Sequence, residues 1–133
     1  MKKHILIRTA VILLITLNVN DLSAQDWNSI HPGGTSTLVD TTLIRSVVVT
    51  IDQGETIGPV THPAHFAYIL KGGRIEVDFQ GKKSVIMNLK QGKSLFNNPE
   101  GPHKVTNIGD NSVSFLLVEL KNYPYKKTAE KEE

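Results

Sequence analysis

The chain contains no cysteine among its 133 residues. It therefore has no disulfide framework and no cysteine for lipidation, and the lack of Cys is compatible with an oxidising compartment. The sequence also has no Gly-rich phosphate loop, no serine nucleophile elbow and no spaced pair of carboxylates. These absences give no support to nucleotide binding, serine hydrolase chemistry or glycoside hydrolysis.

The chain also lacks a strong excess of charge of one sign. Its 15 Lys and Arg residues stand against 13 Asp and Glu residues, which gives a formal net charge of +2. Residues 1–24 contain three of the basic residues and one of the acidic residues, so the remainder carries 12 of each. Nucleic-acid binding requires a basic surface that meets the phosphates. We therefore expect no nucleic-acid partner.

The N-terminal segment has the layout of a secretory signal peptide. Residues 1–8 carry three basic side chains, residues 11–17 are apolar, and Ala24 provides a small residue before Gln25. The apolar stretch is too short and too interrupted for a membrane span. We predict a signal peptide over residues 1–24 and export to the periplasm or the medium. An uncleaved N-terminal anchor is the alternative.

The rest of the chain has the pattern of an all-β protein. Turn chemistry at His31 and the Pro-Gly-Gly after it predicts an irregular leader over residues 25–40, with His31 as a loop residue. Short β-type runs then alternate with Gly, Pro, Asn and Asp turns, at residues 43–51, 67–70, 74–79, 84–89 and 113–120. This pattern predicts one β-sandwich or barrel domain over residues 41–122, followed by a polar tail over residues 123–133.

Two stretches of this domain carry side chains suited to chemistry. The first, residues 54–72, contains His62-Pro63-Ala64-His65 and closes on Gly72. The second, residues 92–107, contains Pro99-Glu100-Gly101, then His103 and Asn107. The order and spacing of these residues resemble the two motifs of the cupin superfamily, and the resemblance extends from Ser46 to Lys121. It implies a double-stranded β-helix, or jelly-roll barrel, and a homodimer.

The resemblance also implies a metal site. His62, His65 and His103 would point into the barrel and hold a divalent transition metal, with Zn, Fe, Ni, Mn and Cu all open. His65 stands where the cupin pattern usually has Glu, and Val60 stands where its first His usually lies. Pro63 provides a strand break that lets His62 and His65 face the same interior.

The surrounding residues complete the predicted site. Tyr68 and Asn107 are assigned to a ligand pocket next to the metal. Structural alternatives stay open for each: a core or wall position for Tyr68, and a turn with Gly109 for Asn107. A turn position for His62 and a neutral, hydrogen-bonded position for His65 are also open. Glu55 and Glu100 are expected to be solvated loop charges.

Two functions follow from this reading. The first is an exported cupin that binds a small polar or anionic molecule, through a divalent metal held by the three histidines. The alternative is a metal-dependent cupin enzyme, such as an isomerase, a lyase or a dioxygenase, and no motif positions a catalytic base. A third reading is a domain that only binds other proteins. The polarity of the cavity distinguishes these functions. A cavity lined by histidines and a few polar groups supports ligand chemistry, whereas one filled with Ile, Val and Phe supports a scaffold.

Overall fold

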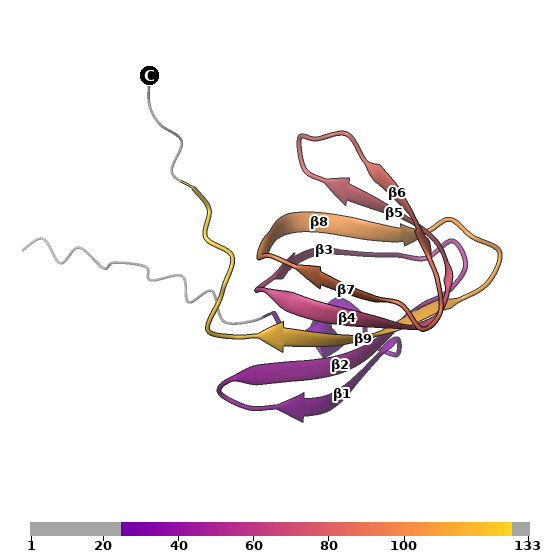
Figure 1. Cartoon of the computed structure of the whole chain (residues 1–133). Helices are drawn as coiled ribbons and strands as arrows, with labels where there is room; N and C mark the ends of the chain where they lie inside the picture. Colours follow the sequence, from indigo (N-terminus) through magenta and orange to yellow (C-terminus); the bar gives the residue numbers. More distant parts are fainter. Residues whose placement is uncertain (1–24, 129–133) are drawn as a thin grey trace, which may run out of the picture.

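The computed structural model describes residues 25–128, which form two antiparallel sheets (Figure 1). The five-stranded sheet has the order β1 (Thr35–Asp40), β2 (Ile44–Ile51), β9 (Val113–Leu120), β4 (His65–Lys71), β7 (Ser94–Asn97). The four-stranded sheet has the order β3 (Thr56–His62), β8 (Glu100–Asn107), β5 (Gly73–Phe79), β6 (Val85–Leu89). The prediction of an all-β jelly roll is confirmed. The predicted signal peptide, residues 1–24, lies outside the described residues.

The core lies between the sheets and follows the alternation of side chains along each strand. Val47, Val49 and Ile51 of β2 are fully buried, and Ile57 and Val60 of β3 approach them from the other sheet. Successive side chains of a strand point to opposite faces, so every second residue reaches this core. The same alternation brings the candidate site residues of β3, β4 and β8 to the interior.

The leader is more ordered than the sequence predicts. Residues 25–40 contain a short helix, α1 (Trp27–Ile30), and strand β1. Asp26 caps α1 by accepting a hydrogen bond from the backbone N–H of Asn28, and the Trp27 side chain is buried in the core. The side chains of β1 are mostly exposed, so this strand is held to β2 by backbone pairing. Because neither face of β1 is buried, its sequence shows no alternation of apolar and polar residues. No helix within residues 25–128 is long and apolar enough to span a bilayer.

Strands β3, β7 and β8 were not predicted, although they carry part of the site. The sequence of β3 contains Gly58-Pro59 and that of β8 contains Pro102, which are residues typical of turns. The pairing of β3 with β8 shifts register on both sides of Val60. Proline is tolerated at such irregular positions of a sheet, so these residues interrupt the ladder without ending the strands.

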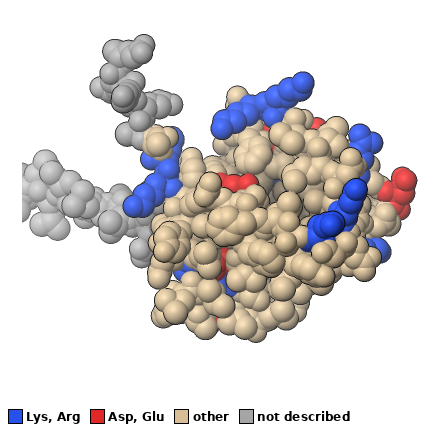
Figure 2. All heavy atoms as spheres, in the orientation of Figure 1, with Lys and Arg blue, Asp and Glu red and all other residues tan. Residues whose placement is uncertain are grey.

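Large apolar side chains are exposed on the outer face of β4 and β7 in the five-stranded sheet. Phe66, Tyr68 and Leu70 of β4 and Phe96 of β7 all point outward, and Phe66 pairs directly with Phe96. These four residues are called the outer apolar face below. Lys, Arg, Asp and Glu side chains gather mainly around the margins of the molecule in this view (Figure 2).

The C-terminal segment closes the end of the barrel beside the histidines. The backbone N–H of Ala64 donates to the Tyr123 carbonyl at 2.9 Å, and that of Leu120 donates to the Ala64 carbonyl at 2.8 Å. A Cβ atom on Gly101 would lie 2.9 Å from the Tyr125 ring, so glycine lets the tail pack closely there. These contacts fix the connection between β3 and β4.

Candidate metal centre

Three histidines from three strands meet at one end of the barrel. His62 ends β3, His65 begins β4 and His103 lies in β8, and all three are buried. The His62 ring centroid lies 4.7 Å from that of His65 and 5.1 Å from that of His103. Pro63 and Ala64 separate β3 from β4, which belong to different sheets, so both flanking histidines face inward. The predicted strand break is confirmed.

The hydrogen bonds of the three rings fix which nitrogen carries the proton. Each Nδ1 lies near an oxygen: 3.0 Å from Glu119 Oε1 for His62, 2.8 Å from the Pro63 carbonyl for His65, and 2.8 Å from the Gly101 carbonyl for His103. A carbonyl or carboxylate oxygen only accepts, so each Nδ1 donates. In the neutral rings each Nε2 atom therefore keeps its lone pair, which is the form of imidazole that ligates a metal.

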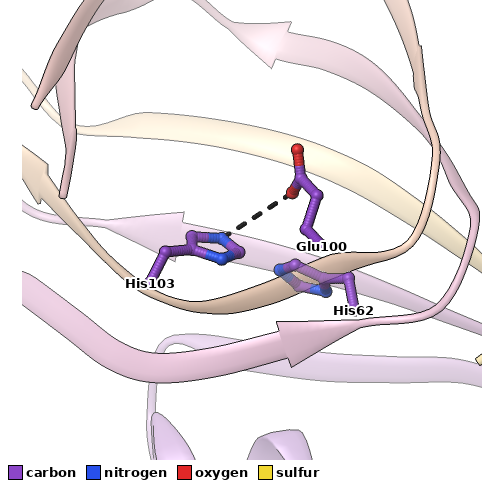
Figure 3. A group of neighbouring side chains, drawn as sticks. All are labelled: His62, Glu100 and His103. Carbon is purple, nitrogen blue, oxygen red and sulfur yellow. Dashed lines mark ion pairs between the residues drawn. The ribbon is translucent and has the colours of Figure 1, made fainter. Parts of the chain in front are cut away.

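Glu100 joins this group, and the expectation of a solvated loop charge is wrong for it. Its side chain is 26% exposed, and its Oε2 lies 3.7 Å from His65 Nε2 and 3.8 Å from His103 Nε2. Ligand atoms of His62, Glu100 and His103 all lie within 4.8 Å of one another (Figure 3). The register of β3 with β8 sets Glu100 directly opposite His62. The sequence signal that could have identified Glu100 is its position three residues before His103, a predicted ligand.

His65 lies beside that group, and both of its ring nitrogens make hydrogen bonds. Its Nε2 accepts a hydrogen bond from the Asn97 side-chain amide at 3.2 Å, while its Nδ1 donates to the Pro63 carbonyl. This matches the neutral, hydrogen-bonded alternative for His65. A metal that took His65 as a ligand would displace the Asn97 amide from that nitrogen.

A buried network holds His62 from behind. The Glu119 carboxylate accepts from Nδ1 of His62, from Nε1 of Trp27 at 3.3 Å and from Nε of Arg45 at 2.8 Å. The Trp27 ring stacks on the His62 ring with centroids 5.3 Å apart. Arg45 also donates to the Gln25 carbonyl. A ligating histidine whose second nitrogen is held by a carboxylate is oriented for binding a metal.

The charges of this network follow from its contacts. Burial alone raises the pKa of Glu119, but the hydrogen bond from His62 and the charge of Arg45 outweigh it, so this pKa lies below its usual 4.5. Burial lowers the pKa of His62 below 6.5 and outweighs the opposing effect of Glu119. Glu119 is therefore ionised and His62 neutral near pH 7.

The two residues assigned to the ligand pocket lie elsewhere. Tyr68 is 39% exposed on the outer apolar face, because it alternates with the inward residues of β4. Asn107 is fully buried but shapes a turn: its amide donates to the carbonyls of Ile51 and Asn111, and its Oδ1 accepts from the Gly109 backbone. Neither residue lines the cavity, and the turn alternative for Asn107 is correct.

Other residues singled out from the sequence serve the fold. His31 is buried just after α1, where its Nε2 donates to the Thr50 carbonyl at 2.7 Å. Its Nδ1 lies 3.4 Å from a carboxylate oxygen of Glu55. Val60 is a core residue paired with His103 in the sheet, so no ligand stands at that position.

The group of donors fits a divalent first-row transition metal. Two imidazole nitrogens and one carboxylate form the set typical of mononuclear metal sites that keep open positions for other ligands. Nδ1 of each histidine is already committed to an oxygen, so the free donors converge without rearrangement of the tautomers.

The comparisons with known proteins agree with this architecture. A family model described as Cupin domain matches residues 47–119, more than half of the chain. The chain belongs to the cupin family. The predicted membership of the cupin family is thereby confirmed. No curated protein sequence matches this cupin.

Solved structures similar to this cupin share its fold. A cupin domain from Bordetella pertussis Tohama I has a TM-score of 0.61 and 19% identity, over 65% of this chain and 91% of that one. An RmlC-like cupin with a double-stranded β-helix fold from Methanocaldococcus jannaschii has a TM-score of 0.51 and 18% identity, over 65% and 77%. FeII HppE has a TM-score of 0.53 and 21% identity, over 65% of this chain and 50% of its own.

The interior of this cupin contains a cavity of about 220 Å³ that reaches the candidate metal centre. Five lining residues are polar: His62, His65, Asn97, Glu100 and His103. The other twelve are apolar and come from strands of both sheets. The cavity is neither uniformly polar nor a solid packing of Ile, Val and Phe, which favours ligand chemistry at its polar end.

Proposed function

We propose that this cupin binds a divalent transition metal through His62, His103 and Glu100, and binds a small molecule at the open positions of that metal. His65, next to Glu100, is available as a fourth ligand. One carboxylate leaves the metal with a net positive charge, which favours an anionic or chelating oxygen ligand. When bound, the metal supplies Lewis acidity toward that oxygen.

The observation that carries this proposal is the convergence of His62, His103 and Glu100, whose ligand atoms lie within 4.8 Å of one another. The Nε2 atoms of His65 and His103 lie within 3.8 Å of the same Glu100 oxygen, and the Nδ1 atoms all donate elsewhere. Buried polar groups are normally paired among themselves. The Nε2 lone pairs of His62 and His103 beside the partly exposed Glu100 carboxylate instead form a set of acceptors, which a cation completes.

The test is the metal content of the protein purified without a His-tag or chelator, by elemental mass spectrometry. We expect about one equivalent per chain, either as purified or after titration with Fe, Zn, Ni, Mn or Cu, since two imidazoles and a carboxylate suit these metals. The double variant His62→Ala, His103→Ala and the isosteric Glu100→Gln should each lose this metal. Asp78→Asn, on the exposed side of β5, is the control. Metal content that stays unchanged in the histidine double variant would disprove the site.

A metal-dependent enzyme is the second candidate function. The two-histidine, one-carboxylate group favours it, because such a set leaves several metal positions open and is typical of non-haem Fe(II) oxygenases. HppE, a structural neighbour, is described with FeII and with a substrate. Iron-loaded protein that consumes dioxygen only when a bound small molecule is present would support turnover. Binding of the small molecule without consumption of dioxygen would contradict the oxygenase and favour a protein that only binds its ligand.

We also propose export, with a mature chain that begins at Gln25. Gln25 is held at both its backbone and its side chain: its carbonyl accepts from Arg45, and its Oε1 accepts from the Thr61 N–H at 2.8 Å. These contacts support a mature N-terminus that forms part of the fold. N-terminal sequencing of the protein from cell fractions tests this. A full-length chain that begins at Met1 in the membrane fraction would contradict it.

We propose in addition that the protein is a homodimer joined through the outer apolar face. Phe66, Tyr68, Leu70 and Phe96 are 38–63% exposed on adjacent strands. A contiguous apolar patch of this kind on a soluble domain usually marks an interface. The face lies opposite the cavity side of β4, so pairing would leave the metal centre accessible.

A further inference from the structure

The cavity is arranged in layers, with polar side chains in the first layer only. His65 pairs with Asn97, and these two residues form the polar end together with His62, Glu100 and His103. Phe79, which pairs with His103, is the apolar member of this first layer. Two residues further along each strand, the side chains that face the cavity are all apolar. This second layer contains Ala67, Leu95, Leu117, Val77 and Val105, as the strand registers show.

A third layer continues the apolar wall. Ile69 pairs with Phe115 in the five-stranded sheet, and Ile75 pairs with Met87 in the four-stranded sheet. All four line the cavity. Each step of two residues advances about 7 Å along a strand, so the apolar wall extends over about 14 Å from the metal centre.

The charges of the wall restrict the ligand further. Among the described residues that line the cavity there is no Lys or Arg, and Glu100 is the one carboxylate. A second anionic group on the ligand, placed among the apolar layers, would therefore lack a partner. Burying an unpaired charge is costly, so this part of the ligand must be uncharged.

We propose that the ligand of this cupin is an amphiphile, with one chelating oxygen head at the metal and one uncharged apolar body in the second and third layers. The inference rests on the proposed metal site and narrows its ligand from any small polar or anionic molecule. The cavity volume is about 220 Å³, and an apolar cavity of about 150 Å³ already binds benzene. The body is therefore the size of one substituted ring or a short branched chain.

The experiment compares two ligands that have the same head. Acetohydroxamate and benzohydroxamate chelate through identical oxygens, and only the second carries a ring. Both are titrated calorimetrically into protein loaded with Zn, which is redox-inert, after metal content has been measured. We expect benzohydroxamate to bind at least about tenfold more tightly, because its ring leaves water for an apolar wall. Benzamide, which has the ring without the chelating head, should bind much more weakly than benzohydroxamate.

A variant of the wall locates the effect. Ala67→Leu fills the second layer, so the advantage of benzohydroxamate should fall at least about threefold while acetohydroxamate and metal uptake stay unchanged. Tyr68→Leu places the same side chain on the neighbouring, outward-facing position and should leave the ratio unchanged. If Ala67→Leu does not fold, Val85→Asp is used instead and should lower the advantage of benzohydroxamate in the same way. Val85 lines the cavity and is 49% exposed, so a charged side chain is tolerated there more readily than in the core.

The outcomes separate the two proposals. Bound metal with a strong preference for benzohydroxamate supports both. Bound metal with equal affinities, or with tighter binding of acetohydroxamate, overturns the amphiphilic ligand and leaves the metal site standing. Failure to take up any metal overturns the metal site, and with it the position assigned to the chelating head.

Discussion

At the scale of single residues, hydrogen bonds to Nδ1 decide what the histidines can do. His103 and His65 donate to backbone carbonyls that lie two residues earlier in the chain, so their tautomers are set locally. His62 donates to Glu119, which lies on β9, 57 residues away. The orientation of His62 therefore depends on the tertiary structure. A substitution at Glu119 can alter this orientation while the proposed ligands themselves stay unsubstituted.

The first prediction concerns Glu119→Gln, which keeps the shape of the side chain and removes its charge. The variant removes the charged acceptor of the hydrogen bonds from Arg45, so we expect a loss of stability on the order of 2 kcal/mol. We also expect metal affinity to fall about 10- to 100-fold, since an outer partner of a ligand is lost. Urea unfolding and metal titration measure both effects, and the exposed Asp78→Asn is the control. Unchanged metal affinity in a folded Glu119→Gln protein would contradict the positioning role.

The second prediction concerns Trp27, the single tryptophan of the chain. Trp27→Phe keeps an aromatic ring against His62 but removes the N–H that donates to Glu119, which should cost about 1 kcal/mol. Trp27→Ala also opens a cavity in the core and should cost about 3–5 kcal/mol. Circular dichroism during urea unfolding measures both variants. Equal losses in the two variants would show that the ring itself contributes little.

At the scale of elements, the irregular pairing of β3 with β8 shapes the metal centre. Gly58 lies in the segment where the register shifts, and its φ angle is +107°. A Cβ atom there would lie 2.7 Å from the carbonyl oxygen of His103. The backbone of a candidate ligand strand therefore approaches its neighbour more closely than any side chain at Gly58 would permit.

The third prediction compares two glycines that both have positive φ. Gly54→Ala meets no atom within 4 Å, so its cost is only the left-handed conformation, about 1–2 kcal/mol. Gly58→Ala adds a backbone clash and should cost about 2 kcal/mol more. Since the clash displaces His103, metal affinity should fall in Gly58→Ala and stay unchanged in Gly54→Ala. Chemical unfolding and metal titration test this pair, and indistinguishable variants would refute the role assigned to the close approach.

At the scale of the whole molecule, the two faces of β4 have different surroundings. His65, Ala67 and Ile69 face the cavity, while Phe66 and Tyr68 lie on the outer apolar face. One strand thus carries both the candidate site and the candidate interface. The proposed dimerisation and the proposed ligand binding should therefore be separable by substitutions one residue apart.

The fourth prediction follows from that separation. Phe96→Glu places a charge on the outer apolar face, where Phe96 is 63% exposed, and should convert a dimer into a folded monomer that still binds metal. Ile86→Glu, at a 51% exposed position on β6 of the other sheet, should leave the dimer intact. Light scattering coupled to size-exclusion chromatography gives the masses. A wild-type protein that is monomeric at high concentration would rule out the interface.

Much of the fold was predictable from local pattern. The alternation along Arg74 to Phe79 and the apolar run that ends at Ile51 predicted β5 and β2, because period-two burial leaves a direct trace in a sequence. Strand β1 left no such trace, since it pairs through its backbone and exposes most of its side chains. Strand β8 was not predicted because it contains a proline, which is typical of turns. Whether a proline ends a strand depends on its register with the neighbouring strand, and that register is set by the tertiary structure.

The sequence by itself determined the family of this protein and the histidines of its candidate site, because motif residues are recognised by type and spacing. Only the tertiary structure brought Glu100 opposite His62, turned Tyr68 outward and placed Glu119 behind the site. The tertiary structure also divided the cavity into a polar end and apolar layers. The physical reason is that strand register and bulges, which are set by contacts between distant segments, decide which side chains share a face.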